Sequence, residues 1–87
     1  LYDRAGFESE LAGLCAREGL AVIPYYALAS GFLTGKYRTA ADAAKSTRGA
    51  RAKAMLDARG LRILSALDQA AAATGSPAAQ VALAWLL

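Results

Sequence analysis

The chain has 87 residues, 56% of them hydrophobic, and its ten Lys and Arg against seven Asp and Glu give a net charge of +3. This length suits one small domain, and within it neither a signal-peptide pattern nor a run of about 20 apolar residues is visible. With no histidine and one cysteine, these residues alone cannot assemble a His-based triad, a zinc site or a disulfide.

An amphipathic helix is predicted over residues 7–18. Apolar residues recur on one face at helical spacing, at Phe7, Leu11, Leu14 and Cys15. Gly19 follows the helix, where glycine readily adopts the left-handed cap conformation. Because Cys15 lies on the apolar face, we expect a buried structural thiol in a reducing compartment, which favours a cytoplasmic protein.

A short buried strand is predicted near residues 21–25. Residues 20–25 form the continuous apolar run Leu-Ala-Val-Ile-Pro-Tyr, which is typical of a strand covered on both faces. Pro24 cannot donate to a sheet ladder, so we place it near the carboxyl end of the strand. A helix followed at once by a buried strand is one step of an α/β fold.

The stretch from Tyr26 to about Thr47 shows no persistent period and is predicted to be a long loop. Loops of this length are uncommon unless they serve a function. Helical character returns at about Gly49, with a break expected at Gly60.

A second apolar stripe leads to the end of the chain. Its members are Leu61, Leu64, Leu67 and Ala71. The stripe ends at Gly75, and Ser76-Pro77 then supplies an N-cap and a proline at the first position of a final helix, residues 77–87. That helix is apolar nearly all round, so we expect it to be buried in something larger than this chain.

Both ends of the sequence favour an internal piece of a longer protein. The chain opens at Leu1 without a start methionine, and the apolar run 81–87 has nothing after it to finish the helix. In such a piece we expect the apolar faces of Leu61, Leu64, Val81 and Trp85 to stay partly exposed.

The segment from Val22 to Arg38 carries the most chemical information. In a barrel of alternating strands and helices, the loops at the carboxyl ends of the strands build the active site. An aromatic ring there can stack on a flat heterocycle, and small residues let backbone N–H groups approach phosphate oxygens. A phosphate-binding G-x-x-x-x-G-K-[ST] loop is excluded, because Ser30 and Tyr37 occupy two of its required positions.

The run from Tyr25 to Tyr37 resembles the loop after the seventh barrel strand of aldo-keto reductases, often Y-S-P-L-A-x-G-x-L-T-G-K-Y. Residues 76–87 resemble the family's helix before strand eight, and residues 1–4 are similar to the stretch after strand six. One departure is Tyr26-Ala27, which replaces the frequent Ser-Pro of the family.

The resemblance implies an α/β fold in which residues 1–87 form the C-terminal part of a single (β/α)8 TIM-barrel domain, incomplete at both ends. As it stands, this part would be mostly helical, with one short strand near residues 21–25. The rest of the barrel would be needed for folding, because one strand cannot make a barrel sheet.

The resemblance also implies a set of NADPH-binding residues. They are Tyr25, Tyr26, Ala27, Leu28, Ala29, Ser30, Lys36 and Arg48. Tyr25 would stack on the nicotinamide, residues 26–30 would line the pyrophosphate, and Lys36 and Arg48 would meet phosphate groups, including the 2′-phosphate of NADPH. The ordinary alternatives are a core tyrosine, glycine turns and solvated charges. No catalytic or metal-binding residue is assigned, since the family's catalytic tetrad lies in its N-terminal half.

The function implied is that of an NADPH-dependent oxidoreductase that transfers hydride to aldehydes or ketones. A tyrosine outside this chain would protonate the carbonyl oxygen. The alternative is a cofactor-binding regulatory barrel that resembles the potassium-channel β subunits. A basic helical module for nucleic acid is disfavoured, because the basic helices lack base-reading or stacking residues. The expected partner is a small carbonyl compound, without nucleic acid or membrane.

Overall fold

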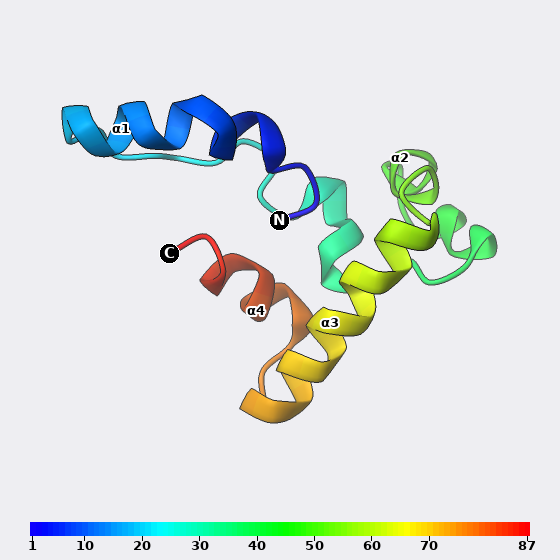
Figure 1. Ribbon diagram of the computed structural model, residues 1–87. Helices are drawn as coiled ribbons and strands as arrows, with labels where there is room; N and C mark the ends of the chain where they lie inside the picture. The colour runs from blue at the N-terminus through cyan, green and yellow to red at the C-terminus, as the bar shows by residue number, and fades with distance from the viewer.

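The computed structural model describes all residues, 1–87, as helices joined by loops (Figure 1). The order is π-helix η1 (Phe7–Leu11), α1 (Ala12–Glu18), 3₁₀ helices η2 (Ala29–Thr34) and η3 (Ala40–Lys45), α2 (Gly49–Lys53), α3 (Ala58–Thr74) and α4 (Ala78–Ala84). No β-strand occurs among these residues. None of the helices combines the length and apolar composition that a bilayer span requires.

The helix predicted over residues 7–18 is confirmed as the continuous pair η1 and α1. It ends where Gly19 adopts a left-handed conformation, with φ of 65°. Figure 1 shows this rod projecting away from the other helices. Neither η1 nor α1 buries a residue, so the expectation of a fully buried Cys15 is wrong, and its side chain is half-buried.

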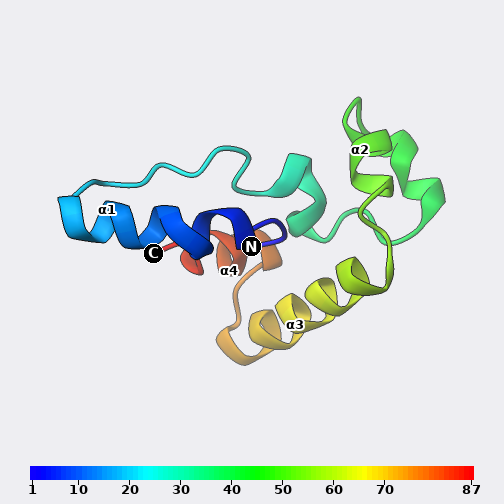
Figure 2. The same cartoon turned by 45° about the horizontal axis from the view of Figure 1, so that its top comes forward.

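The strand predicted near residues 21–25 is absent. Residues 21–25 make no backbone hydrogen bond, and Ile23 and Tyr25 are 93% and 87% exposed. Figure 2 shows the segment as an extended connection that leads from α1 to η2. A strand exists only where another extended segment pairs with it, and residues 1–87 provide none.

The stretch predicted as one long loop contains two short helices, η2 and η3. The start of η3 is held by a capping box, in which Asp42 Oδ2 accepts from the Thr39 N–H at 2.9 Å. The prediction missed both helices, since six residues are too few for a helical period to show. A local cap therefore holds η3, whereas η2 has no side-chain cap and buries Phe32 and Leu33.

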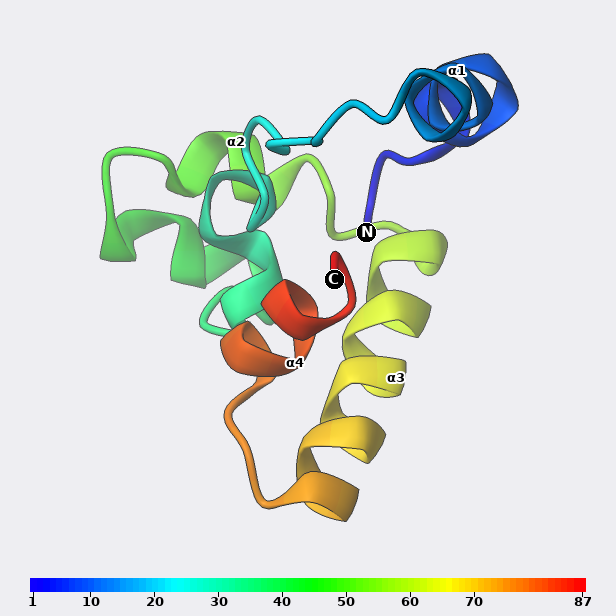
Figure 3. The same ribbon diagram turned by 90° about the vertical axis from the view of Figure 1, so that its left-hand side faces the viewer.

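The core forms where η2 packs among α2, α3 and α4, an arrangement visible in Figure 3. Its buried apolar members are Phe32, Leu33, Tyr37, Ala52, Leu64, Leu67 and Ala82. Phe32 is fully buried, and the ring of Tyr2 meets it edge-on with centroids 5.7 Å apart. The part of the chain without a helical period thus supplies the centre of the core.

Gly60 does not break a helix, contrary to the prediction. The break lies at residues 54–57, and α3 begins at Ala58 with Asp57 as its N-cap, where Asp57 Oδ1 accepts from the Gly60 N–H at 2.7 Å. A Cβ on Gly60 would collide with the Met55 carbonyl oxygen and come within 3.1 Å of Phe32 Cζ. Glycine is needed here for close packing.

The end of the chain agrees with the prediction only in part. The helix that carries the second apolar stripe ends before Gly75, as predicted, and Gly75 caps α3 with φ of 66°. However, Pro77 occupies the N-cap position with ψ of 149°. The predictions of Ser76 as the N-cap and of Pro77 as the first helical residue are therefore wrong. The final helix covers Ala78–Ala84 and does not extend to Leu87.

Exposure of the apolar stripes is also only partly as expected. Leu61 and Trp85 are 49% and 46% exposed, and Val81 is half-buried. Leu64, in contrast, is 1% exposed because it belongs to the core cluster. The expectation of an exposed Leu64 is therefore wrong.

Candidate functional site

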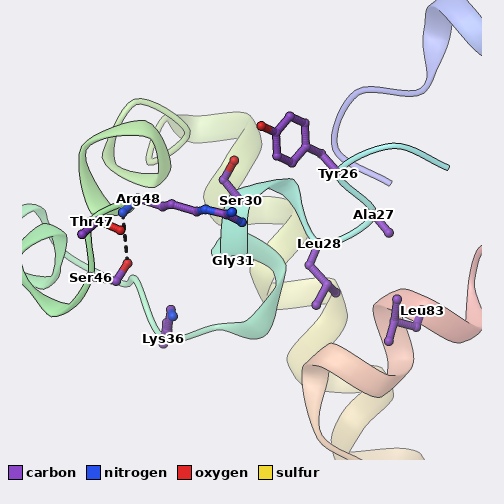
Figure 4. A pocket seen from close by; sticks show the side chains of 10 residues that line it. All are labelled: Tyr26, Ala27, Leu28, Ser30, Gly31, Lys36, Ser46, Thr47, Arg48 and Leu83. Carbon is purple, nitrogen blue, oxygen red and sulfur yellow. Dashed lines mark hydrogen bonds between the residues drawn. The ribbon is translucent and has the colours of Figure 1, made fainter.

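An open pocket of about 500 Å³ lies between the segment around η2 and the connection from η3 to α2. Its lining residues, shown in Figure 4, are Tyr26, Ala27, Leu28, Ser30, Gly31, Lys36, Ser46, Thr47, Arg48 and Leu83. Six of the eight residues that the sequence singled out therefore lie around one cavity, and Tyr25 and Ala29 do not line it.

Tyr25 and Ala29 lie beside the pocket. The Tyr25 side chain is exposed, and its ring packs on the ring of Tyr26 with centroids 4.5 Å apart and planes 57° apart. Ala29 contributes backbone geometry, with its N–H donating to the Tyr26 carbonyl at 2.8 Å. Tyr25 thus faces solvent and Tyr26, not the cavity.

Four lining residues were not singled out from the sequence. Gly31, Ser46 and Thr47 fall in the stretch that was predicted only to be a long loop. Leu83 comes from α4, far away in the sequence, and helical periodicity says nothing about which cavity a residue borders. The folded chain, and no local pattern, brings these residues to the pocket.

The pocket wall contains a strained stretch of backbone. Tyr26, Ala29 and Ser30 have φ of 53°, 49° and 57°, and Gly31 follows with φ of 94°. Side-chain-bearing residues rarely adopt this left-handed region, and each costs about 1–3 kcal/mol there. Such conformations cluster at functional sites, where the surrounding structure holds them in place.

Several hydrogen-bonding groups around the pocket make no hydrogen bond within the chain. Ser30 is only 7% exposed, and its hydroxyl makes no hydrogen bond. The backbone N–H groups of Ala27, Leu28, Ser46 and Thr47 also donate to no acceptor. No buried side-chain polar atom of the chain lacks a partner, so the Ser30 hydroxyl stays open to the pocket, and these groups are free to bond to water or to a ligand there.

Two cations face the pocket without acidic neighbours. No Asp or Glu lines it, and the ion pairs of the chain join Arg4 to Glu8, Arg38 to Asp68 and Lys45 to Asp42. Lys36 and Arg48 therefore have no carboxylate partner, and their charges make the cavity attractive to anions. Figure 4 shows the Arg48 side chain extending across the cavity toward Ser30 and Gly31.

The Lys36 side chain passes close over η2. Its ammonium lies 5.1 Å from the centre of the Tyr37 ring, a cation–π distance. A Cβ built on Gly31 would lie 3.4 Å from Lys36 Cε and 3.7 Å from Nζ. Glycine at position 31 leaves the backbone beside this ammonium uncovered.

A sequence profile of the Aldo/keto reductase family matches residues 2–87. The chain belongs to the aldo-keto reductase family. Comparison with curated proteins and with solved structures gives no match. Aldo-keto reductases are oxidoreductases, their fold is the (β/α)8 barrel, and they generally use NAD(P)H. The helices of this chain are consistent with a helical portion of that fold.

In this aldo-keto reductase chain, the rim of the pocket carries an unexpected tyrosine–arginine contact. The guanidinium carbon of Arg51 lies 5.6 Å from the centre of the Tyr26 ring. Arg51, and secondarily Tyr25, lowers the pKa of the Tyr26 hydroxyl below its usual value. The aromatic residue that departs from the family pattern is thus associated with a cation.

The two walls of the pocket are tied together beneath Lys36. Tyr37 is buried, and its hydroxyl is hydrogen-bonded to Ser46 Oγ. The Lys45 ammonium also donates to the Lys36 carbonyl at 3.1 Å. The segments that carry Lys36 and Arg48 are therefore held at a fixed separation.

Proposed function

We propose that this chain supplies part of the NADPH-binding site of a (β/α)8-barrel enzyme that reduces aldehydes or ketones. The observation that carries the proposal is the pocket at η2. It brings together, around one cavity, Lys36 and Arg48, which are two cations without carboxylate partners, Ser30, and the free N–H groups of Ala27 and Leu28.

The donors of the pocket suit a phosphate-bearing ligand. Phosphate oxygens accept hydrogen bonds and carry negative charge, and both requirements are met by Lys36, Arg48 and the unpartnered N–H groups. No acidic side chain opposes them within the lining. The dinucleotide cofactors of aldo-keto reductases contain a pyrophosphate, and NADPH carries a further 2′-phosphate.

NADPH would donate hydride to the carbonyl carbon, while a proton is added to the carbonyl oxygen. The residues of this chain would orient the cofactor, which is the usual part of a protein in such chemistry. We assign no catalytic residue among residues 1–87 and place the proton donor elsewhere in the barrel.

Replacing Lys36 in the intact protein tests the proposal. A charge-assisted hydrogen bond to phosphate contributes about 1.5–3 kcal/mol, so Lys36→Ala should weaken NADPH binding roughly ten- to a hundredfold. Lys53→Ala is the matched control, because Lys53 is exposed on α2 and does not line the pocket. Dissociation constants are measured at fixed ionic strength for NADPH and NADH.

The two cofactors separate the possible contacts of Lys36. A loss for NADPH alone would assign Lys36 to the 2′-phosphate, and an equal loss for both would assign it to the pyrophosphate. Unchanged affinity for both would reject the role of Lys36. Cofactor binding without turnover of any carbonyl compound by the intact protein would favour the regulatory alternative instead.

A further inference from the structure

Arg38 folds back onto the turn that carries Lys36. Its Nε donates to the Gly35 carbonyl at 2.7 Å. Its two terminal nitrogens donate to the two carboxylate oxygens of Asp68 on α3, each at 2.8 Å. This paired geometry fixes the orientation of a guanidinium more strictly than a single contact does. Arg38 therefore connects the turn at residues 35–38 to α3.

Gly35 makes this arrangement possible. It adopts φ of 81°, and a Cβ at this position would lie 2.6 Å from Arg38 Nη2. The missing side chain leaves room for the guanidinium directly over the turn. On the other side of Lys36, the ring of Tyr37 is buried. Lys36 is thus the central, pocket-facing residue of a turn that is anchored before and after it.

Stability alone does not account for the Arg38–Asp68 pair. The Arg38 side chain is 40% exposed and that of Asp68 is 52% exposed. Exposed ion pairs usually contribute little to folding, because water and salt screen them. The three bonds of Arg38 instead join the Gly35 carbonyl to Asp68 on α3.

We propose that Arg38 and Asp68 are positioning residues for cofactor binding, which fix the turn at residues 35–38 so that the Lys36 ammonium faces the pocket. This inference rests on the proposed function, because it requires Lys36 to meet a phosphate group. Neither Arg38 nor Asp68 lines the pocket, so both act through Lys36.

Replacing Asp68 separates positioning from simple electrostatics. Asp68→Asn removes a negative charge, and through the electric field alone this change would strengthen the binding of an anion. If Asp68 holds the turn, the same substitution weakens binding, since Arg38 loses its charged partner. The two explanations therefore predict changes of opposite sign.

The experiment measures NADPH dissociation constants for Asp68→Asn in the intact protein, with and without Lys36→Ala. We expect about two- to fivefold weaker binding when Lys36 is present, the scale of an exposed ion pair. No further weakening is expected in the Lys36→Ala background. Arg38→Lys should behave like Asp68→Asn, because lysine keeps the charge but cannot form the three bonds.

Glu8→Gln is the matched control for Asp68→Asn. Glu8 is also an exposed carboxylate paired with an arginine, Arg4, and it does not line the pocket. Its replacement should leave NADPH affinity unchanged. An equal loss from Glu8→Gln would overturn the proposal.

The remaining outcomes are also decisive. Unchanged or tighter binding by Asp68→Asn, or equal weakening with and without Lys36, would overturn the positioning role. If Lys36→Ala itself has no effect, the proposed role of Lys36 fails and the positioning role fails with it. If Lys36→Ala weakens binding and Asp68→Asn does not, only the positioning role is lost.

Discussion

The N-terminal rod and the segment from Tyr26 to Arg48 differ in how sequence periodicity relates to burial. The rod, η1 with α1, has clear helical periodicity, yet it buries no residue. The segment 26–48 has no period, yet it supplies Phe32, Leu33 and Tyr37 to the core and most of the pocket. A regular sequence pattern therefore predicts local structure but not burial, and the segment without a pattern contributes to both the core and the candidate site.

The largest loss of stability should come from removing a buried aromatic ring in the segment 26–48. Phe32 is fully buried, so Phe32→Ala should lower the free energy of unfolding by about 3–5 kcal/mol. Phe7 is 37% exposed on the rod, and Phe7→Ala should cost clearly less. Chemical denaturation of the intact protein measures both. Equal losses of stability in the two variants would contradict the difference in burial between the two regions.

A smaller loss of stability is expected from replacing Gly60, where η2 approaches α3. The methyl group added by Gly60→Ala would collide with the Met55 carbonyl and contact Phe32 closely. We therefore expect the free energy of unfolding to fall by about 1–3 kcal/mol. Gly13 on the rod is the matched control, because a Cβ there meets only the flexible end of Arg17. Gly13→Ala should be neutral or stabilising in the same denaturation experiment. A stabilising Gly60→Ala would show that the close packing is not required.

The strained backbone of the pocket wall gives a third test, of opposite sign. Ala29 has φ of 49°, which glycine adopts freely, so Ala29→Gly should stabilise the fold by about 0.5–1 kcal/mol. Ala27 has no such positive φ, and Ala27→Gly should destabilise the fold by a similar amount. Thermal unfolding of both variants checks the sign. Destabilisation by Ala29→Gly would argue against strain at this position.

The smallest effect should appear in acid. The Arg38 and Thr39 N–H groups and the Lys45 ammonium hold the pKa of Asp42 well below its usual value, and the Arg38 guanidinium lowers that of Asp68. Since both folded-state pKa values lie below the unfolded value of 3.8, the contribution is present above about pH 4 and is lost as pH falls below it. Unfolding measured from pH 6 down to pH 3 should show a shallower decline for Asp42→Asn. An unchanged decline would mean that Asp42 does not contribute.

Part of this architecture could be predicted from the sequence, because some features depend only on neighbouring residues. The helix over residues 7–18, its glycine cap at Gly19 and the end of the second stripe at Gly75 are of this kind, and all are confirmed. The strand near residues 21–25 is not, because pairing depends on a partner segment. Gly60 was misread for a related reason: a glycine that ends a helix and one that permits close packing look alike in sequence.

Some residues of the candidate site could likewise be predicted from the sequence, and others could not. Residues 26–28, Ser30, Lys36 and Arg48 could be predicted because they match positions of the loop that this stretch resembles, and all of them line the pocket. Ser46 and Thr47 carry no such pattern, and the connection that holds them is tied to the turn after η2 by the bonds of Tyr37 with Ser46 and of Lys45 with the Lys36 carbonyl. The functional roles of the predicted residues stay predictions.

The pocket is nearly continuous in sequence, since all its lining residues except Leu83 fall within residues 26–48. Contacts between residues close in the chain require only short loops to close, and they form early in folding. Exchange of this one segment between related proteins would therefore transfer nearly the whole pocket lining at once. On the proposed function, cofactor preference would then change by recombination at a single place in the chain, without redesign of α3 or α4.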